Sequence, residues 1–145
     1  AHLFTTGANP VSCEAALATL EMIEEEHLLE ASTEKGKYVR QTMDRWVKDY
    51  DCIGDVRGIG LSIGIDVVSN SIEKTRDPEA ALKICNYCFD KGIVIIAVAG
   101  NVLRFQPPLV ITYEQLDYAL TTIENAIKAL NNGELNQYEI EGQGW

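Results

Sequence analysis

Apolar residues recur with a helical period over four stretches of the chain. Between residues 10 and 29 they fall at intervals of three and four positions, which places them on one face of an α-helix. The same period predicts three further helices, which end near Asp51, Lys91 and Leu130, and Gly36 is expected to interrupt the second helix early. The stripe that the first helix is predicted to pack consists of Cys13, Ala16, Leu17, Leu20 and Ile23.

Local signals mark where the last two of these helices begin. Asp77 followed by Pro78 is a helix N-cap followed by a proline in the first turn. Thr112 and Gln115 have the spacing of a capping box, in which each side chain bonds the backbone N–H of the other residue.

A period of two residues predicts β-strands elsewhere. Residues 61 to 67 alternate apolar with small or polar residues, which is typical of a strand with one buried face. Apolar runs at 93 to 98 and 102 to 105 are joined by a short turn, so an antiparallel hairpin is expected. Residues 70 to 76 are polar and are expected to form a loop. The predicted fold class is α+β, with a small antiparallel sheet of about three strands covered by helices.

Arg104 interrupts the apolar run of the last predicted strand. Because side chains alternate along a strand, Arg104 is expected to point away from the face shared by Leu103 and Phe105. Arginine stays charged and is rarely buried without a partner. Two explanations remain open from this strand alone: an anionic ligand on the second face, or a buried arginine paired with a nearby Asp or Glu. Pro107 and Pro108 then end the strand.

The N-terminal loop offers a second candidate site. Thr5, Thr6 and Gly7 precede Asn9, a good N-cap, and Pro10, which suits the first helical turn. Hydroxyls and backbone N–H groups at such a helix start can bind a phosphate. The same residues also suit an ordinary helix start.

Three motifs together resemble one known family. In order and spacing they are similar to the C-terminal part of class III aminotransferases, the pyridoxal-phosphate enzymes that include 4-aminobutyrate and ornithine aminotransferases. The resemblance covers residues 1 to about 131. The motifs are His2-x-x-Thr5-x-x-x-Asn9-Pro10, Ile53-Gly54-Asp55-Val56-Arg57-Gly58-x-Gly60-Leu61 and Leu103-Arg104-x-x-Pro107-Pro108-Leu109.

Shorter stretches resemble one group within that family, the branched-chain amino-acid 2-epimerases of lactic acid bacteria. These stretches are His2-Leu3-Phe4-Thr5-Thr6, Ala99-Gly100-Asn101, Phe105-Gln106 and Gly144-Trp145.

The resemblance implies a fold, a cofactor and site residues. The fold would be the C-terminal small domain of a fold-type I pyridoxal-phosphate enzyme, with pyridoxal 5'-phosphate as cofactor. Thr5 would hydrogen-bond the cofactor phosphate across a dimer interface, with Thr6 as a second contact, although Ala8 stands where the family often has glycine. Arg104 would contact the substrate carboxylate, although in some members this arginine pairs with an internal glutamate.

The resemblance also implies what the chain lacks. The lysine that forms a Schiff base with the cofactor would lie upstream, on a large domain, so no catalytic residue is assigned here and the chain alone is expected to be inactive. The whole protein, expected to be a homodimer, would be an aminotransferase of amino acids such as 4-aminobutyrate, with 2-oxoglutarate as acceptor. The alternative is an isoleucine 2-epimerase. A second alternative is a non-catalytic interaction module.

Composition excludes several other classes of function. The chain has 145 residues, of which 46% are hydrophobic and 23% charged, and its formal net charge is −10. Nucleic-acid and anionic-membrane binding are not expected, because both need basic patches. No apolar run approaches the roughly 20 residues of a membrane span and no signal peptide is recognised, so a piece of a longer cytoplasmic protein is expected. It would comprise one domain at residues 1–131 and a polar tail at 132–145.

Two other patterns suggest sites on a first reading. Cys85 and Cys88 have metal-ligand spacing, but no second ligand pair accompanies them, so no metal is predicted. They also share a helical stripe with Ala81 and Phe89 and are predicted to be core residues.

The glycines at 58, 60 and 64 precede and enter a strand, whereas a dinucleotide site needs them between a strand and a helix. A nucleotide site is therefore rejected. The neighbouring Arg57 could contact a ligand, but a structural salt bridge is favoured.

Overall fold

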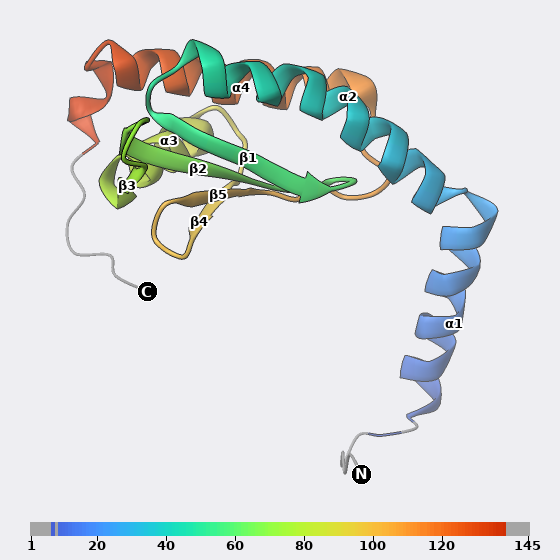
Figure 1. The fold of residues 1–145 in the computed structure, drawn as a ribbon. Coiled ribbons are helices and arrows are strands. Elements are labelled where there is room, and N and C mark those ends of the chain that lie inside the picture. The colour runs from blue at the N-terminus through green and yellow to red at the C-terminus, as the bar shows by residue number, and fades with distance from the viewer. Residues whose placement is uncertain (1–6, 8, 139–145) are drawn as a thin grey trace.

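The structure is a computed structural model that describes residues 7 and 9–138. Figure 1 shows helices lying along a small sheet, with the first helix projecting away from it. In chain order the elements are α1 (Pro10–Glu25), α2 (Leu28–Asp49), β1 (Ile53–Ile59), β2 (Ser62–Asn70), β3 (Thr75–Arg76), α3 (Pro78–Asp90), β4 (Ile96–Val98), β5 (Val102–Phe105), α4 (Tyr113–Asn131) and the 3-10 helix η1 (Glu134–Gln137).

The sheet is antiparallel, with strand order β1-β2-β5-β4, and β3 pairs with the end of β2. The predicted α+β class is confirmed, and so is the hairpin of β4 and β5. The predicted number of about three strands was too low, because the sheet has five. The missing strands are β1 and the two-residue β3, which lies in the segment predicted to be a loop.

A β-bulge explains why β1 has no readable period. The pairing with β2 shifts between Ile53 and Asp55, so the buried side chains of this strand are three positions apart, at Ile53 and Val56. The run at 93 to 98 is shorter as a strand than predicted, because only Ile96–Val98 pairs with β5.

One face of the sheet forms the core with three helices. The alternating apolar residues of β2, Ile63, Ile65 and Val67, are buried. Leu103 and Phe105 on β5 are buried as well. They pack with apolar side chains of α2, α3 and α4 in one cluster. The helices contribute Val39, Met43 and Trp46 from α2, Ile84 and Cys88 from α3, and Leu116, Ile123 and Ile127 from α4.

No helix or strand of the described residues lies over the other face of the sheet (Figure 1). We call this the open face. Its residues come from alternate positions of β1, β2, β4 and β5 and pair across the sheet with one another: Asp55, Arg57, Ile59, Ser62, Gly64, Asp66, Ile96, Val98, Val102 and Arg104. One side of the sheet therefore supplies stability, while the other side is free to carry polar groups.

The first predicted helix is divided in two. α1 ends at Glu25, and His27 has a left-handed φ of 50° before α2 begins at Leu28. Because the chain turns there and α1 leaves the body, α1 buries none of its residues. The predicted packing stripe of α1 therefore contributes nothing to the core of this chain.

Gly36 lies in the middle of α2 and does not interrupt it, contrary to the prediction. A Cβ at this position would lie 2.4 Å from the carbonyl oxygen of Gly60. The glycine therefore lets α2 approach the backbone of the turn between β1 and β2.

The predicted helix starts are confirmed. Asp77 accepts a hydrogen bond from the backbone N–H of Ala80, and Thr112 and Gln115 form a complete capping box. Within the tail predicted from residue 132, Leu135 is buried and the Tyr138 hydroxyl donates to Asp90 over 2.7 Å. Among the described residues, no helix combines the length and apolar character that a membrane crossing requires.

We predict that Gly36→Ala destabilises the protein by about 1–3 kcal/mol, because an added methyl group would overlap backbone that cannot move cheaply. Helix propensity alone predicts the opposite sign, a gain of about 0.5–1 kcal/mol. Urea unfolding measures the change. As a control, the same substitution in an isolated peptide of residues 28–49 should increase helicity by circular dichroism. A stabilised protein would contradict the close approach.

Candidate functional site

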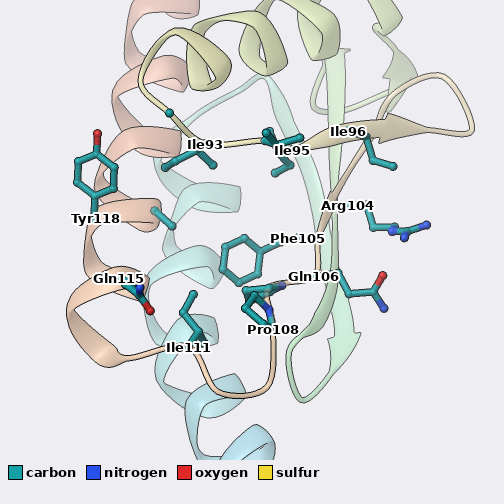
Figure 2. Close-up of a pocket in the computed structure, with 14 residues that line it drawn as sticks. Ile93, Ile95, Ile96, Arg104, Phe105, Gln106, Pro108, Ile111, Gln115 and Tyr118 are labelled. Carbon is teal, nitrogen blue, oxygen red and sulfur yellow. The ribbon is translucent and has the colours of Figure 1, made fainter. Parts of the chain in front are cut away.

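Arg104 lies in the middle of β5 on the open face. Its cross-strand neighbours are Gly64 on β2 and Ile96 on β4. Figure 2 shows Arg104 and Gln106 pointing to one side of the strand and Phe105 pointing to the other. The predicted alternation is therefore confirmed.

The guanidinium of Arg104 is available to a ligand. The residue is exposed, and none of the ion pairs within the described part of the chain involves it. Of the two explanations open from the sequence, a buried arginine paired with a local acid is wrong. An exposed planar cation on a rigid strand suits bidentate contact with a carboxylate or phosphate.

Arg57 is the second arginine of the open face, and it is paired with two aspartates. Its two terminal nitrogens donate to the two carboxylate oxygens of Asp66 over 2.5 and 3.1 Å, and Nη1 also contacts Asp55 at 3.2 Å. The hydrogen bonds to Asp66, and then to Asp55, raise the pKa of Arg57 above its ordinary value. The favoured interpretation of Arg57 as a salt-bridge residue is confirmed.

Two uncharged polar side chains lie near the same end of the face. The Gln106 amide donates to the Ser62 hydroxyl over 3.3 Å, linking β2 to the residue that follows β5. Sequence reasoning did not single out this pair, although Gln106 lies two positions after Arg104 and so shares its face.

A groove of about 520 Å³ lies beside β5, between residues 92–96, residues 104–108 and the start of α4. Its inner lining is mostly apolar and includes Ile95, Phe105 and Ile111. Arg104 borders the groove, but its guanidinium points away from this lining in Figure 2. The groove and the charged open face thus adjoin along β4 and β5, where Ile96 and Arg104 border both.

The predicted phosphate contacts Thr5 and Thr6 lie outside the described residues. The helix start next to them is described: the Asn9 side chain accepts hydrogen bonds from the backbone N–H groups of Val11 at 3.0 Å and Ser12 at 3.4 Å. The predicted N-cap is therefore confirmed, and the phosphate contact stays a prediction.

Cys85 and Cys88 are buried on α3, as their helical spacing predicted, and both are free thiols. Phe89 was wrongly placed with them, since it is 67% exposed. In the part of the chain that the structure describes, no group of three or more His, Cys, Asp or Glu side chains could hold a metal ion. The glycines at 58 and 64 lie on β1 and β2, with Gly60 in the turn between them.

Comparison with known proteins identifies the family. The aminotransferase class-III profile matches residues 1–127. The chain belongs to this family. One relative, the isoleucine 2-epimerase of Lentilactobacillus buchneri, is 48% identical over 100% of this chain and 32% of its own length.

Other relatives in the family include racemases and aminotransferases. The leucine/methionine racemase of Thermococcus litoralis is 39% identical over 99% of this chain and 33% of its own length. The probable 4-aminobutyrate aminotransferase of Bacillus subtilis is 34% identical over 86% of this chain and 29% of its own length. The chain spans about a third of the length of these relatives.

Solved structures agree with this assignment. An amine transaminase from an uncultivated Pseudomonas species, solved in its PLP-bound form, matches with a TM-score of 0.82 and 28% identity over 88% of this chain and 29% of its own. Pyridoxal 5'-phosphate is the cofactor of this family, as the resemblance implied. The predicted small-domain fold of such an enzyme is confirmed.

The described residues fit one requirement of an amino acid bound to this cofactor, a partner for its carboxylate. Arg104 offers a fork for a carboxylate, and Ser62 and Gln106 offer further polar groups on the same face. No lysine lies on the open face among the described strand residues. Covalent attachment of the cofactor therefore has no candidate on this face.

We predict that Cys85 and Cys88 resist alkylation in the folded chain. Burial raises the pKa of Cys85 to about 11 and of Cys88 to about 12, so at pH 8 roughly a thousandth or less of each is thiolate. Iodoacetamide labelling followed by peptide mass spectrometry should modify the exposed Cys13 first, and all sites should react in urea. Equal rates at Cys13 and Cys88 in the native state would contradict the buried assignment.

Proposed function

We propose that the complete protein is a pyridoxal-phosphate enzyme that epimerises an aliphatic amino acid at Cα, with Arg104 binding the substrate carboxylate. The observation that carries the carboxylate contact is the exposed guanidinium of Arg104, which has no ion pair among the described residues. Support for epimerisation comes from the isoleucine 2-epimerase at 48% identity and the leucine/methionine racemase at 39% identity, both named for inversion of an amino acid.

In this proposal each residue of the chain has a binding role. Bound pyridoxal phosphate would act as an electron sink when the Cα–H bond of the amino acid breaks. Arg104 holds the carboxylate through two parallel hydrogen bonds, which limits rotation of the substrate about Cα. Thr5 binds the phosphate of the cofactor and Thr6 provides a second contact there.

Other parts of the enzyme complete the site. We expect the cofactor-binding lysine on a large domain outside this chain, and we expect a homodimer in the cytoplasm in which Thr5 serves the partner subunit. The 145-residue chain would then be inactive alone.

A second candidate is transamination of 4-aminobutyrate with 2-oxoglutarate as acceptor. Support comes from the relative of Bacillus subtilis at 34% identity. Arg104 suits this reaction equally, because both of these substrates carry a carboxylate. The two candidates differ in the fate of the proton, which an epimerase returns to the opposite side of Cα.

We predict that the full-length enzyme with pyridoxal phosphate converts L-isoleucine to D-allo-isoleucine without any oxo acid, as measured by chiral chromatography. Parallel reactions contain 4-aminobutyrate and 2-oxoglutarate. Glutamate formed there, with no D-allo-isoleucine in the first reaction, would establish the aminotransferase instead. Absence of both D-allo-isoleucine and glutamate would favour the non-catalytic interaction module.

We predict that Arg104→Ala in the full-length enzyme raises KM for the carboxylate substrate by about 10- to 150-fold. Loss of a hydrogen bond to a charged group costs about 1.5–3 kcal/mol. Arg104→Lys should have a smaller effect, because it keeps the charge and loses the fork. As a control, inhibition by 2-methylbutylamine, which lacks the carboxylate of isoleucine, should be unaffected. An unchanged KM would reject the assignment.

A further inference from the structure

Asp66 lies between the two arginines of the open face. On β2, Gly64 pairs with Arg57 on one side and with Arg104 on the other. Asp66 is two positions further along β2 on the same face, so it lies diagonal to both arginines. Diagonal neighbours in an antiparallel sheet are about 7–8 Å apart, within reach of long side chains. By position in the sheet, Asp66 could pair with either arginine.

The structure shows that Asp66 pairs with Arg57. Both carboxylate oxygens of Asp66 accept hydrogen bonds from Arg57, and Asp55, the cross-strand partner of Asp66, accepts another from Nη1 of the same guanidinium. Asp66 is the least exposed of these three side chains, at 24%. This bidentate geometry directs both carboxylate oxygens of Asp66 toward Arg57, and these oxygens are the atoms that would otherwise attract Arg104.

Gly64 keeps the space between the two arginines clear. A Cβ at this position would lie 3.1 Å from Val102 Cγ1 and 3.9 Å from the carbonyl oxygen of Arg57. Because Gly64 has no side chain, a small anion can approach Arg104 without displacing a side chain of β2.

Charge balance on the face depends on Arg57. With both arginines present, the two aspartates are neutralised in formal charge. Without Arg57, two carboxylates would remain near a single cation, and the Asp66 oxygens would lose their partner. Asp66 would then compete with an incoming carboxylate for Arg104. Its negative charge would also repel that carboxylate.

We propose that Arg57 is a positioning residue for substrate binding, because it holds Asp66 and Asp55 and so leaves Arg104 open to the substrate carboxylate. This inference rests on the proposed function of Arg104. It assigns Arg57 an effect on affinity that acts through Arg104, in addition to any stabilisation of the β1–β2 hairpin.

The test compares Arg57→Gln with the double variant Arg57→Gln/Asp66→Asn in the full-length holoenzyme. The substrate is whichever of L-isoleucine and 4-aminobutyrate the enzyme converts. In Arg57→Gln we expect KM to rise by about fivefold, the upper end of what an exposed ion pair supplies, while kcat changes less than twofold. In the double variant, which removes the competing charge, KM should return to within about twofold of the original value.

Two controls separate this effect from simple destabilisation. Arg45→Gln removes an exposed arginine from α2, remote from the open face, and should leave KM unchanged. Arg57→Lys keeps the positive charge but cannot make the bidentate contact with Asp66, so a smaller rise in KM is expected. This variant replaces Arg57→Gln in the test if Arg57→Gln does not fold. A purely structural role predicts that removal of Asp66 cannot restore KM.

An unchanged KM in a folded Arg57 variant, or an elevated KM that Asp66→Asn does not restore, would overturn the inference. Arg104→Ala distinguishes this failure from failure of the proposed function. If Arg104→Ala raises KM but the Arg57 variants do not, Arg104 keeps its role and only the positioning role is lost. If Arg104→Ala leaves KM unchanged, both are rejected.

Discussion

The alternation of side chains from Ser62 to Val67 along β2 is the constraint on which the rest of the structure depends. Ile63, Ile65 and Val67 enter the core between the sheet and three helices, so the register of β2 cannot slip by one residue without burying Asp66. The same register fixes Gly64 and Asp66 on the open face and sets which residues of β1 and β5 lie beside them. Packing on one face therefore determines charge placement on the other.

The core and the exposed guanidinium of Arg104 are thereby kept on opposite faces of the sheet. Arg104 follows Leu103 and precedes Phe105, both buried, so its backbone is held by a packed core while its side chain stays exposed. An exposed arginine on a loop would lose more conformational freedom on binding. A strand position gives the guanidinium a fixed origin and direction, which favours an oriented contact.

Sequence reasoning found the parts of the fold that keep a regular period, and missed those where a local feature breaks it. The orientation of Arg104 followed from alternation in four residues. β1 was missed because its bulge places Ile53 and Val56 three positions apart. The behaviour of Gly36 depends on contact with Gly60, which is 24 residues away and invisible to local propensity. The pairing of Asp66 with Arg57 instead of Arg104 likewise depends on tertiary structure, and no period in the sequence predicts it.

The chemistry of the open face also bears on the two reactions proposed for the complete protein. Within the described residues its polar groups are two arginines, two aspartates held by Arg57, a serine and a glutamine. None of these groups is a lysine or a histidine, and both aspartates accept hydrogen bonds from Arg57. Under the proposed function the face binds a carboxylate through Arg104, a requirement shared by amino-acid epimerisation and transamination. Divergence between the two reactions can therefore arise elsewhere in the enzyme while this domain keeps the same arrangement of charges.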